Sequence, residues 1–181
     1  ASIDSKGCWA ESNTVNISNH TLPTVTVNNA AICASGTATL MANGAQTYEW
    51  TPETYLTVNN ANATFSGASE GSYQVTVTGT DGNGCTASAI STITVKPEVV
   101  FELANGSGEL NQNKCANEAI TDIVFNVENA SLSLTGNLPQ GVTFDASEKK
   151  ISGTPTQTGT FEYTIRAVSN QTNPTCETKT L

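Results

Sequence analysis

Residues 72–95 read SYQVTVTGTDGNGCTASAISTITV, and this stretch decides the fold class. Apolar and polar residues alternate through its first half, which places Tyr73, Val75 and Val77 on one face of a strand. The Asp-Gly-Asn-Gly sequence at 81–84 is a turn signal, and the alternation resumes in the second half. Two such runs joined by a turn predict a pair of antiparallel β-strands with one buried face.

Runs of the same kind, separated by turn residues, recur along the chain. They lie at 24–27, 37–41, 47–50 and 63–65 in the first half, and at 99–103, 120–127, 132–134, 138–145, 151–155 and 160–167 in the second. Charged residues make up only 13% of the chain and hydrophobic ones 37%, while Thr, Ser, Asn and Gly are abundant, a composition that favours strands over helices. We therefore expect an all-β protein made of tandem immunoglobulin-like β-sandwich domains.

A Gly-Cys or similar turn, followed by a Ser/Thr/Ala-rich strand, marks the end of each repeat. It occurs at Cys8 and Cys85, and in a more divergent form at Cys176. A motif that recurs in this way indicates a tandem array. The predicted domains are residues 1–22, the final strand of a preceding repeat (near 15–17) plus a linker; 23–97, a first sandwich; and 98–181, a second sandwich with a short last strand.

The short last strand raises a hypothesis of strand exchange. Five residues follow Cys176, whereas ten positions separate Cys85 from Val95. Residues 9–18 could therefore complete the sheet of a neighbouring chain, as in donor-strand assembly. A boundary inside a longer protein explains the same observation more simply, and both interpretations stay open.

Two stretches resemble known repeat families. Residues 138–168, with LPQGVTFD followed by ISGTPTQTGTFEYTI, are similar to the Putative-Ig, cadherin-like repeats of bacterial surface proteins. Residues 23–95, with YEWTP at 48–52 and TDGNGC at 80–85, resemble PKD-like and Ig-like repeats of large secreted or gliding-associated adhesins of Bacteroidetes. The resemblance implies a non-enzymatic extracellular module at the cell surface, either a structural stalk or an adhesin segment. Neither motif includes catalytic residues.

The five cysteines indicate an oxidising, extracytoplasmic setting. Their order pairs Cys33 with Cys85 and Cys115 with Cys176, each bridge closing a loop of about 50–60 residues. Cys8 is left over, and we expect it as a thiol or in an intermolecular disulfide. In a standard sandwich, however, the early and late cysteines lie at opposite ends of strands about 20 Å long, beyond disulfide reach. Either the first strand is arranged differently, or the bridges link neighbouring repeats.

Other candidate sites are weaker. Asp81 and Asn83 carry oxygen ligands that suit calcium, but two side chains fall short of the six or more oxygens that such a site needs, so a plain turn is favoured. We expect no cofactor, and calcium is the alternative. Trp50 is expected in the core rather than as a sugar-stacking platform, and Trp9 is expected to be exposed. Asn-x-Ser/Thr sequons, the signal for glycosylation in eukaryotic secreted proteins, occur at Asn16, Asn19, Asn62, Asn105, Asn129 and Asn170.

The composition also bears on the class of partner. The net charge of −9 disfavours nucleic acid, and no apolar run is long enough to insert into a membrane. A single histidine, His20, and no nucleophile motif leave no catalytic triad to propose, so we expect no enzyme. The expected partners are neighbouring repeats or other copies of the chain. The alternatives are a fibre subunit that uses strand exchange and a module that binds a cell-surface glycan or protein.

Overall fold

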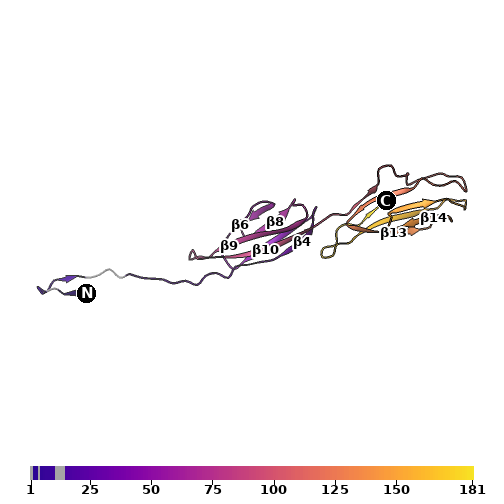
Figure 1. Ribbon diagram of the computed structural model, residues 1–181. Helices are drawn as coiled ribbons and strands as arrows, with labels where there is room; N and C mark the ends of the chain where they lie inside the picture. Colours follow the sequence, from indigo (N-terminus) through magenta and orange to yellow (C-terminus); the bar gives the residue numbers. More distant parts are fainter. Residues whose placement is uncertain (1, 4, 11–14) are drawn as a thin grey trace.

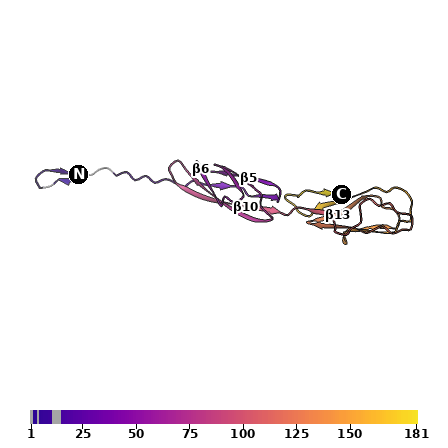
Figure 2. The same ribbon diagram turned by 90° about the horizontal axis from the view of Figure 1, so that it is seen from above.

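The computed structural model describes residues 2–3, 5–10 and 15–181 of the 181-residue chain. Two β-sandwiches follow one another along the chain and lie end to end, which is visible in both views (Figures 1 and 2). Residues 15–22 run away from the first sandwich as an extended chain. In this described part of the chain every regular element is a strand, and no helix is present that is long and apolar enough to cross a membrane.

The first sandwich consists of two four-stranded sheets. One sheet has the order β3-β5-β8-β7 and the other β4-β10-β9-β6. All pairs are antiparallel except β4 with β10, which run parallel. The strands are β3 (Thr26–Val27), β4 (Ala30–Cys33), β5 (Thr37–Asn43), β6 (Thr47–Thr51), β7 (Leu56–Asn59), β8 (Asn62–Ser66), β9 (Gly71–Thr80) and β10 (Thr86–Lys96).

The core of the first sandwich follows from the alternation in its sequence. Every second residue of β5 is buried, and so is every second residue in the later parts of β9 and β10. The buried faces of the two sheets meet around Leu40, Phe65 and Val77, all 0% exposed. Burying such side chains contributes about 1.5–3 kcal/mol each, which makes this core the main source of stability.

The second sandwich repeats the plan with one strand fewer. Its sheets have the orders β11-β12-β15-β14 and β13-β16-β17, and every pair is antiparallel. Phe101, Phe125 and Ile151 lie in a core separate from that of the first sandwich. The strands are β11 (Val100–Leu103), β12 (Ile123–Glu128), β13 (Ala130–Gly136), β14 (Val142–Asp145), β15 (Lys150–Gly153), β16 (Tyr163–Ser169) and β17 (Lys179–Thr180).

The turn before β14 shows why the Leu-Pro-Gln-Gly sequence has its form. Gly141 has φ +90°, and a Cβ atom there would lie 2.1 Å from the carbonyl oxygen of Thr154. The close approach lets Thr154 donate its N–H to the Gly141 oxygen at 2.9 Å. Only glycine combines this backbone angle with so close a contact.

The N-terminal segment differs from the prediction. β1 (Ser2–Ile3) and β2 (Trp9–Ala10) form a two-stranded antiparallel ribbon, and residues 15–17 form no strand. The expected strand near 15–17 is therefore wrong for this structure. A strand needs a partner for its N–H and C=O groups, and no strand among the described residues pairs with residues 15–17. Part of the predicted exchange segment, residues 11–14, lies outside the described residues.

Candidate functional site at the joint between the two sandwiches

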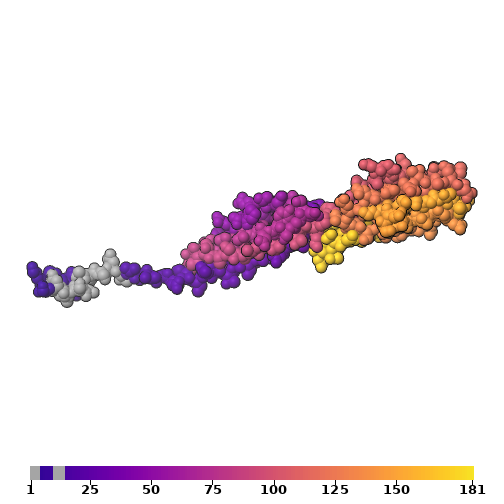
Figure 3. Space-filling model, in the orientation of Figure 1, coloured from indigo at the N-terminus to yellow at the C-terminus, as the bar shows by residue number. Residues whose placement is uncertain are grey.

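The joint is the region where the end of β10 passes into the second sandwich. β4 and β10 run parallel there, with Cys33 beside Lys96, and the N–H of Ala34 donates to the Lys96 oxygen at 3.0 Å. Residues 97–99 then lead into β11, and Val99 is already part of the second core. The linker is therefore short and fixed at both ends. Figure 3 shows the two sandwiches in contact along this boundary.

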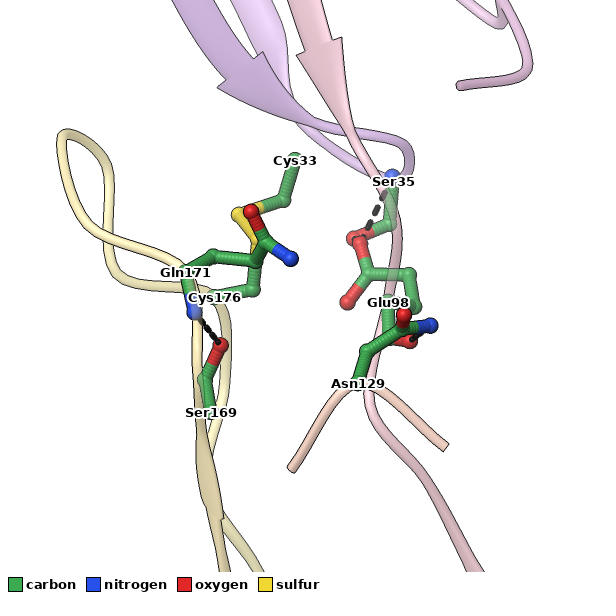
Figure 4. Close-up of a disulfide and its surroundings, with 7 residues drawn as sticks. All are labelled: Cys33, Ser35, Glu98, Asn129, Ser169, Gln171 and Cys176. Atoms are coloured by element: carbon green, nitrogen blue, oxygen red, sulfur yellow. Dashed lines mark hydrogen bonds between the residues drawn. A yellow bond between two sulfur atoms is a disulfide. The ribbon is translucent and has the colours of Figure 1, made fainter. Parts of the chain in front are cut away.

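A disulfide spans the joint, between Cys33 at the end of β4 and Cys176 in the loop between β16 and β17 (Figure 4). Their Cα atoms lie 5.6 Å apart, within the usual range for a disulfide. The expected pairing of Cys33 with Cys85 and of Cys115 with Cys176 is wrong. The alternative, a bridge between neighbouring repeats, is the one the structure contains.

The physical reason lies in where the ends of the sandwiches meet. Cys33 closes a strand that points towards the second sandwich, whereas Cys85 follows β9 at the opposite end of the first. The loop that contains Cys176 projects from the second sandwich towards the first. The two cysteines that face each other across the joint therefore come from different repeats. The conflict between strand length and disulfide reach was the one sequence signal of this arrangement.

Glu98 in the linker forms a second connection. Its Oε1 accepts hydrogen bonds from the Ser35 hydroxyl at 2.6 Å and from the Ser35 N–H at 2.9 Å. Its main-chain oxygen accepts a bond from Nδ2 of Asn129, at the turn between β12 and β13, at 2.9 Å. One residue is thus held by both sandwiches, as Figure 4 shows. Sequence patterns gave no sign of this role.

The Ser35 contacts also change the acidity of Glu98. The hydrogen bond from the Ser35 hydroxyl, and then that from its N–H, hold the pKa of Glu98 below its ordinary value. Partial burial acts in the opposite direction, and the charge of Lys179 adds a smaller lowering. The carboxylate that bridges the joint is therefore ionised under neutral conditions.

The two connections together restrict motion between the sandwiches. A single flexible linker permits bending in every direction about one point. The disulfide adds a second attachment, which Figure 4 shows beside the contact between Ser35 and Glu98. Two separate attachments leave only rotation about the line that joins them, and the Glu98 hydrogen bonds oppose that rotation. The disulfide and the Glu98 hydrogen bonds connect the two sandwiches at this joint.

The calcium candidates do not form a cluster. Oδ1 of Asp81 accepts the N–H groups of Asn83 at 2.8 Å and Cys85 at 2.9 Å, the pattern of an Asx turn. The bond from Cys85 is the largest cause of the lowered pKa of Asp81. No group of three or more metal-ligating side chains occurs among the residues that the structure describes.

The six sequon asparagines are distributed over both sandwiches and the N-terminal segment. Asn16, Asn19, Asn62 and Asn105 are exposed. Asn129 is half-buried and uses its amide to bind Glu98. Asn170 is exposed and accepts a hydrogen bond from Ser131 at 2.6 Å. They do not converge on one surface.

The structure also shows the burial of the two tryptophans and of the cysteines outside the disulfide. Trp50 is 3% exposed and donates its indole N–H to the Asn60 oxygen at 2.8 Å, so the expected core position is confirmed. Trp9 is 71% exposed, also as expected. Cys85 is half-buried and Cys115 exposed, and both are free thiols, while Cys8 lies exposed in the N-terminal segment.

Comparison with known proteins identifies the repeat. The family model described as "Putative Ig domain" matches the chain twice, over residues 12–96 and 113–181. No curated protein sequence matches the chain.

Solved structures with a similar arrangement of strands share little sequence with it. Cadherin domains 1–4 of protocadherin gamma B7 are 11% identical, with a TM-score of 0.40 and coverage of 88% of this chain and 49% of that one. Murine CEACAM1b is 12% identical, with a TM-score of 0.43 and coverage of 87% and 96%. Fibronectin(III)-like modules of CbhA from Clostridium thermocellum are 14% identical, with a TM-score of 0.35 and coverage of 87% and 91%. The chain spans about half the length of the protocadherin fragment.

Proposed function

The chain belongs to the Putative Ig domain family, and we propose that it is a non-enzymatic, extracellular structural segment that works as a stiff spacer in a surface protein. The observation that carries this proposal is the Cys33–Cys176 disulfide, which fixes one repeat to the next. A spacer must transmit position and force along its length, and a free hinge between repeats would defeat that purpose. In the chain-entropy model a crosslink over 143 positions is worth about 5 kcal/mol, more than the hydrogen bonds beside it.

Two observations, the disulfide and the sequence resemblance, support an extracellular location, and the net charge suits an elongated soluble chain. A structural disulfide persists in oxidising compartments and is rare in a reducing cytosol. The net charge of −9 keeps an elongated chain soluble and repels other copies in random orientations. The sequence resemblance to repeats of large bacterial surface adhesins, of the Bacteroidetes type, agrees with this location, and we propose that origin for the chain. In this role the segment holds an adhesive or enzymatic domain away from the cell.

Small-angle X-ray scattering tests the stiff spacer. The intact chain should scatter as one elongated particle of fixed shape at pH 7. A Cys33→Ala/Cys176→Ala double variant should show a broader distribution of interatomic distances, because only the linker and the Glu98 bonds remain. Cys85→Ala is the matched control, because it removes a half-buried cysteine far from the joint and should leave the profile unchanged. Equal flexibility of the intact chain and the double variant would refute the spacer proposal.

A further inference from the structure

β13 forms one edge of the sheet β13-β16-β17, on the side of β16 opposite to β17. It has seven residues, and among the described residues no other strand at the edge of a sheet is longer. Natural proteins protect edge strands by shortness, charge or proline, because unpaired main-chain groups bind other strands. The sequence of β13, Ala-Ser-Leu-Ser-Leu-Thr-Gly, has neither a charged residue nor a proline. This edge therefore lacks the usual protection.

The hydrogen bonds beside β13 show which of its main-chain groups lie free. Just before the strand, the Asn129 oxygen accepts the N–H of Asn170 at 2.9 Å, and the same alternation holds just after it, at Asn137. In an antiparallel pair, positions bonded to the partner alternate with positions whose N–H and C=O groups point away from it. Leu132 and Leu134 therefore direct their main-chain groups to the open edge, where no hydrogen bond from another described residue reaches them.

The corresponding edge strand of the first sandwich, β6, is protected. The N–H of Tyr48 donates to Oδ1 of Asn60 at 3.1 Å, and the indole of Trp50 binds the main-chain oxygen of the same residue. Glu49 also places an exposed charge in the middle of β6. A strand that approached this edge would have to displace Asn60 and meet the carboxylate. The open edge is therefore a property of the second sandwich and not of both repeats.

The side chains of β13 match a second copy of the same strand. Two antiparallel copies centred on Ser133 place Leu132 of one copy opposite Leu134 of the other. In this register the free N–H and C=O groups of the two leucines meet across the pair. The leucine side chains, half-buried beside the second core, lie on one face. On the other face Ser131 lies opposite Thr135, and both are exposed. Such a self-complementary edge suits a two-fold symmetric pair.

The distribution of charge also favours a second copy at this edge. The chain has a net charge of −9, so most approaches of two copies bring like charges together. Residues 129–137, in contrast, contain no charged side chain. Arg166 lies beside Ser133 on β16, and in the pair its counterpart would be three strand spacings away, about 14 Å. This distance exceeds the screening length of about 8 Å at physiological salt, so the two arginines repel each other little.

We propose that β13 is a docking edge for β13 of a second copy of this chain, and that the pair joins two three-stranded sheets into one continuous sheet. Because β13 runs along the length of the second sandwich, the two copies lie antiparallel (Figure 1). The contact involves few residues, so the pair forms at high local concentration and dissociates on dilution. The proposal uses only the second sandwich and does not rest on the stiff-spacer function.

Disulfide trapping in the full chain tests the register. The background carries Cys8→Ser, Cys85→Ser and Cys115→Ser, which leaves the Cys33–Cys176 bond as the only native pair. Ser133→Cys should then form a crosslinked dimer in a glutathione redox buffer, because the two copies of position 133 face each other with Cα atoms about 4.5 Å apart.

Ser131→Cys is the matched control, since it is an exposed serine on the same face of the same strand. In the proposed register its two copies are separated by four residues along the strand, about 13 Å, which is beyond disulfide reach. The yield of dimer should be roughly tenfold or more higher for Ser133→Cys. Alkylation rates of the two thiols correct for reactivity, because Arg166 lies beside position 133 and Val168 beside position 131.

Sedimentation of the chain without added cysteines tests the association itself. The intact chain should show a reversible dimer at high concentration, and Ser133→Lys should weaken it roughly tenfold or more, because two like charges would face each other. Thr39→Lys makes the same change of charge at an exposed position of the first sandwich and should leave the dimer unchanged. Thermal unfolding of both variants checks that the fold is retained.

Two results would overturn the docking proposal. Equal corrected yields from Ser133→Cys and Ser131→Cys would show that thiols meet by random collision. A chain that sediments as a monomer at every concentration would leave the edge of β13 to a strand of another protein. Neither result changes the scattering of the single chain in dilute solution, so failure here is distinct from failure of the stiff spacer.

Discussion

Cys33 and Cys176 are bonded although 143 positions of sequence separate them. They meet because β4 ends at the boundary between the sandwiches and the loop before β17 extends back to the same boundary. Cys176 is 2% exposed, so the bond is shielded from solvent on the side of the second sandwich. This relationship distinguishes the chain from a simple string of independent domains.

Removal of the Ser35 hydroxyl should raise the pKa of Glu98. Ser35→Ala removes the hydroxyl whose hydrogen bond lowers the pKa of Glu98 most, so this pKa should rise towards its ordinary value of 4.5. NMR titration of the Glu98 side chain measures this shift. Asp145, whose pKa is lowered chiefly by its hydrogen bond with Ser147, is the internal control and should titrate as before.

The same carboxylate predicts a pH dependence of the joint. Because the folded-state pKa of Glu98 is lowered, its contribution is fully present above the ordinary value of 4.5 and is lost as the pH falls through the lowered pKa. Scattering profiles of the intact chain should therefore agree between pH 7 and pH 5 and broaden only at more acidic pH. Glu98→Gln should remove this acid-dependent broadening, and persistence of the transition in Glu98→Gln would assign it to another group.

Trp50 should contribute strongly to the stability of the first sandwich. Trp50→Ala should cost about 3–5 kcal/mol through loss of buried apolar surface. Trp50→Phe should cost about 1–3 kcal/mol, because the Asn60 oxygen loses the indole N–H. Trp9→Phe, at an exposed site, should change the free energy of unfolding by less than about 0.5 kcal/mol. Urea unfolding followed by circular dichroism measures all three, and similar losses at Trp9 and Trp50 would contradict the core assignment.

Substitution of two glycines by alanine should distinguish the cost of backbone strain from the cost of steric overlap in the second sandwich. Gly106→Ala introduces an alanine at φ +79° with no other atom within 4 Å, and should cost about 1 kcal/mol. Gly141→Ala meets the same kind of angle and also the Thr154 oxygen, so it should cost about 1–3 kcal/mol more. Thermal unfolding of both variants checks the difference. Equal effects would show that the turn before β14 relaxes without cost.

The strands that alternate clearly were predictable, and those that depend on distant partners were not. The runs at 72–78 and 89–95 became β9 and β10, because one-sided burial imposes a period of two on the sequence. β4, with the sequence Ala-Ala-Ile-Cys, was missed, since its four residues show little alternation and its position depends on β10. Residues 15–17 show alternation but form no strand, because alternation alone provides no hydrogen-bonding partner.

The candidate site was less predictable than the fold. Cysteine order suggested bridges within each repeat, since neighbouring positions in sequence usually lie in the same domain. The observed bridge depends on which ends of two sandwiches face each other, and that is set by the short linker at 97–99. The hydrogen bonds from Ser35 and Asn129 to Glu98 depend on the same orientation. Apart from the conflict between strand length and disulfide reach, the sequence pattern describes one domain at a time and does not show how the two sandwiches are oriented.

Peptide mapping of the purified, non-reduced chain tests the account most directly. The chain is unfolded with free thiols blocked by alkylation, digested without reductant, and its crosslinked peptides are identified by mass spectrometry. The account predicts a peptide pair that joins Cys33 to Cys176, with Cys85 and Cys115 alkylated in the monomer. A peptide pair that joins Cys33 to Cys85, or Cys115 to Cys176, would contradict it.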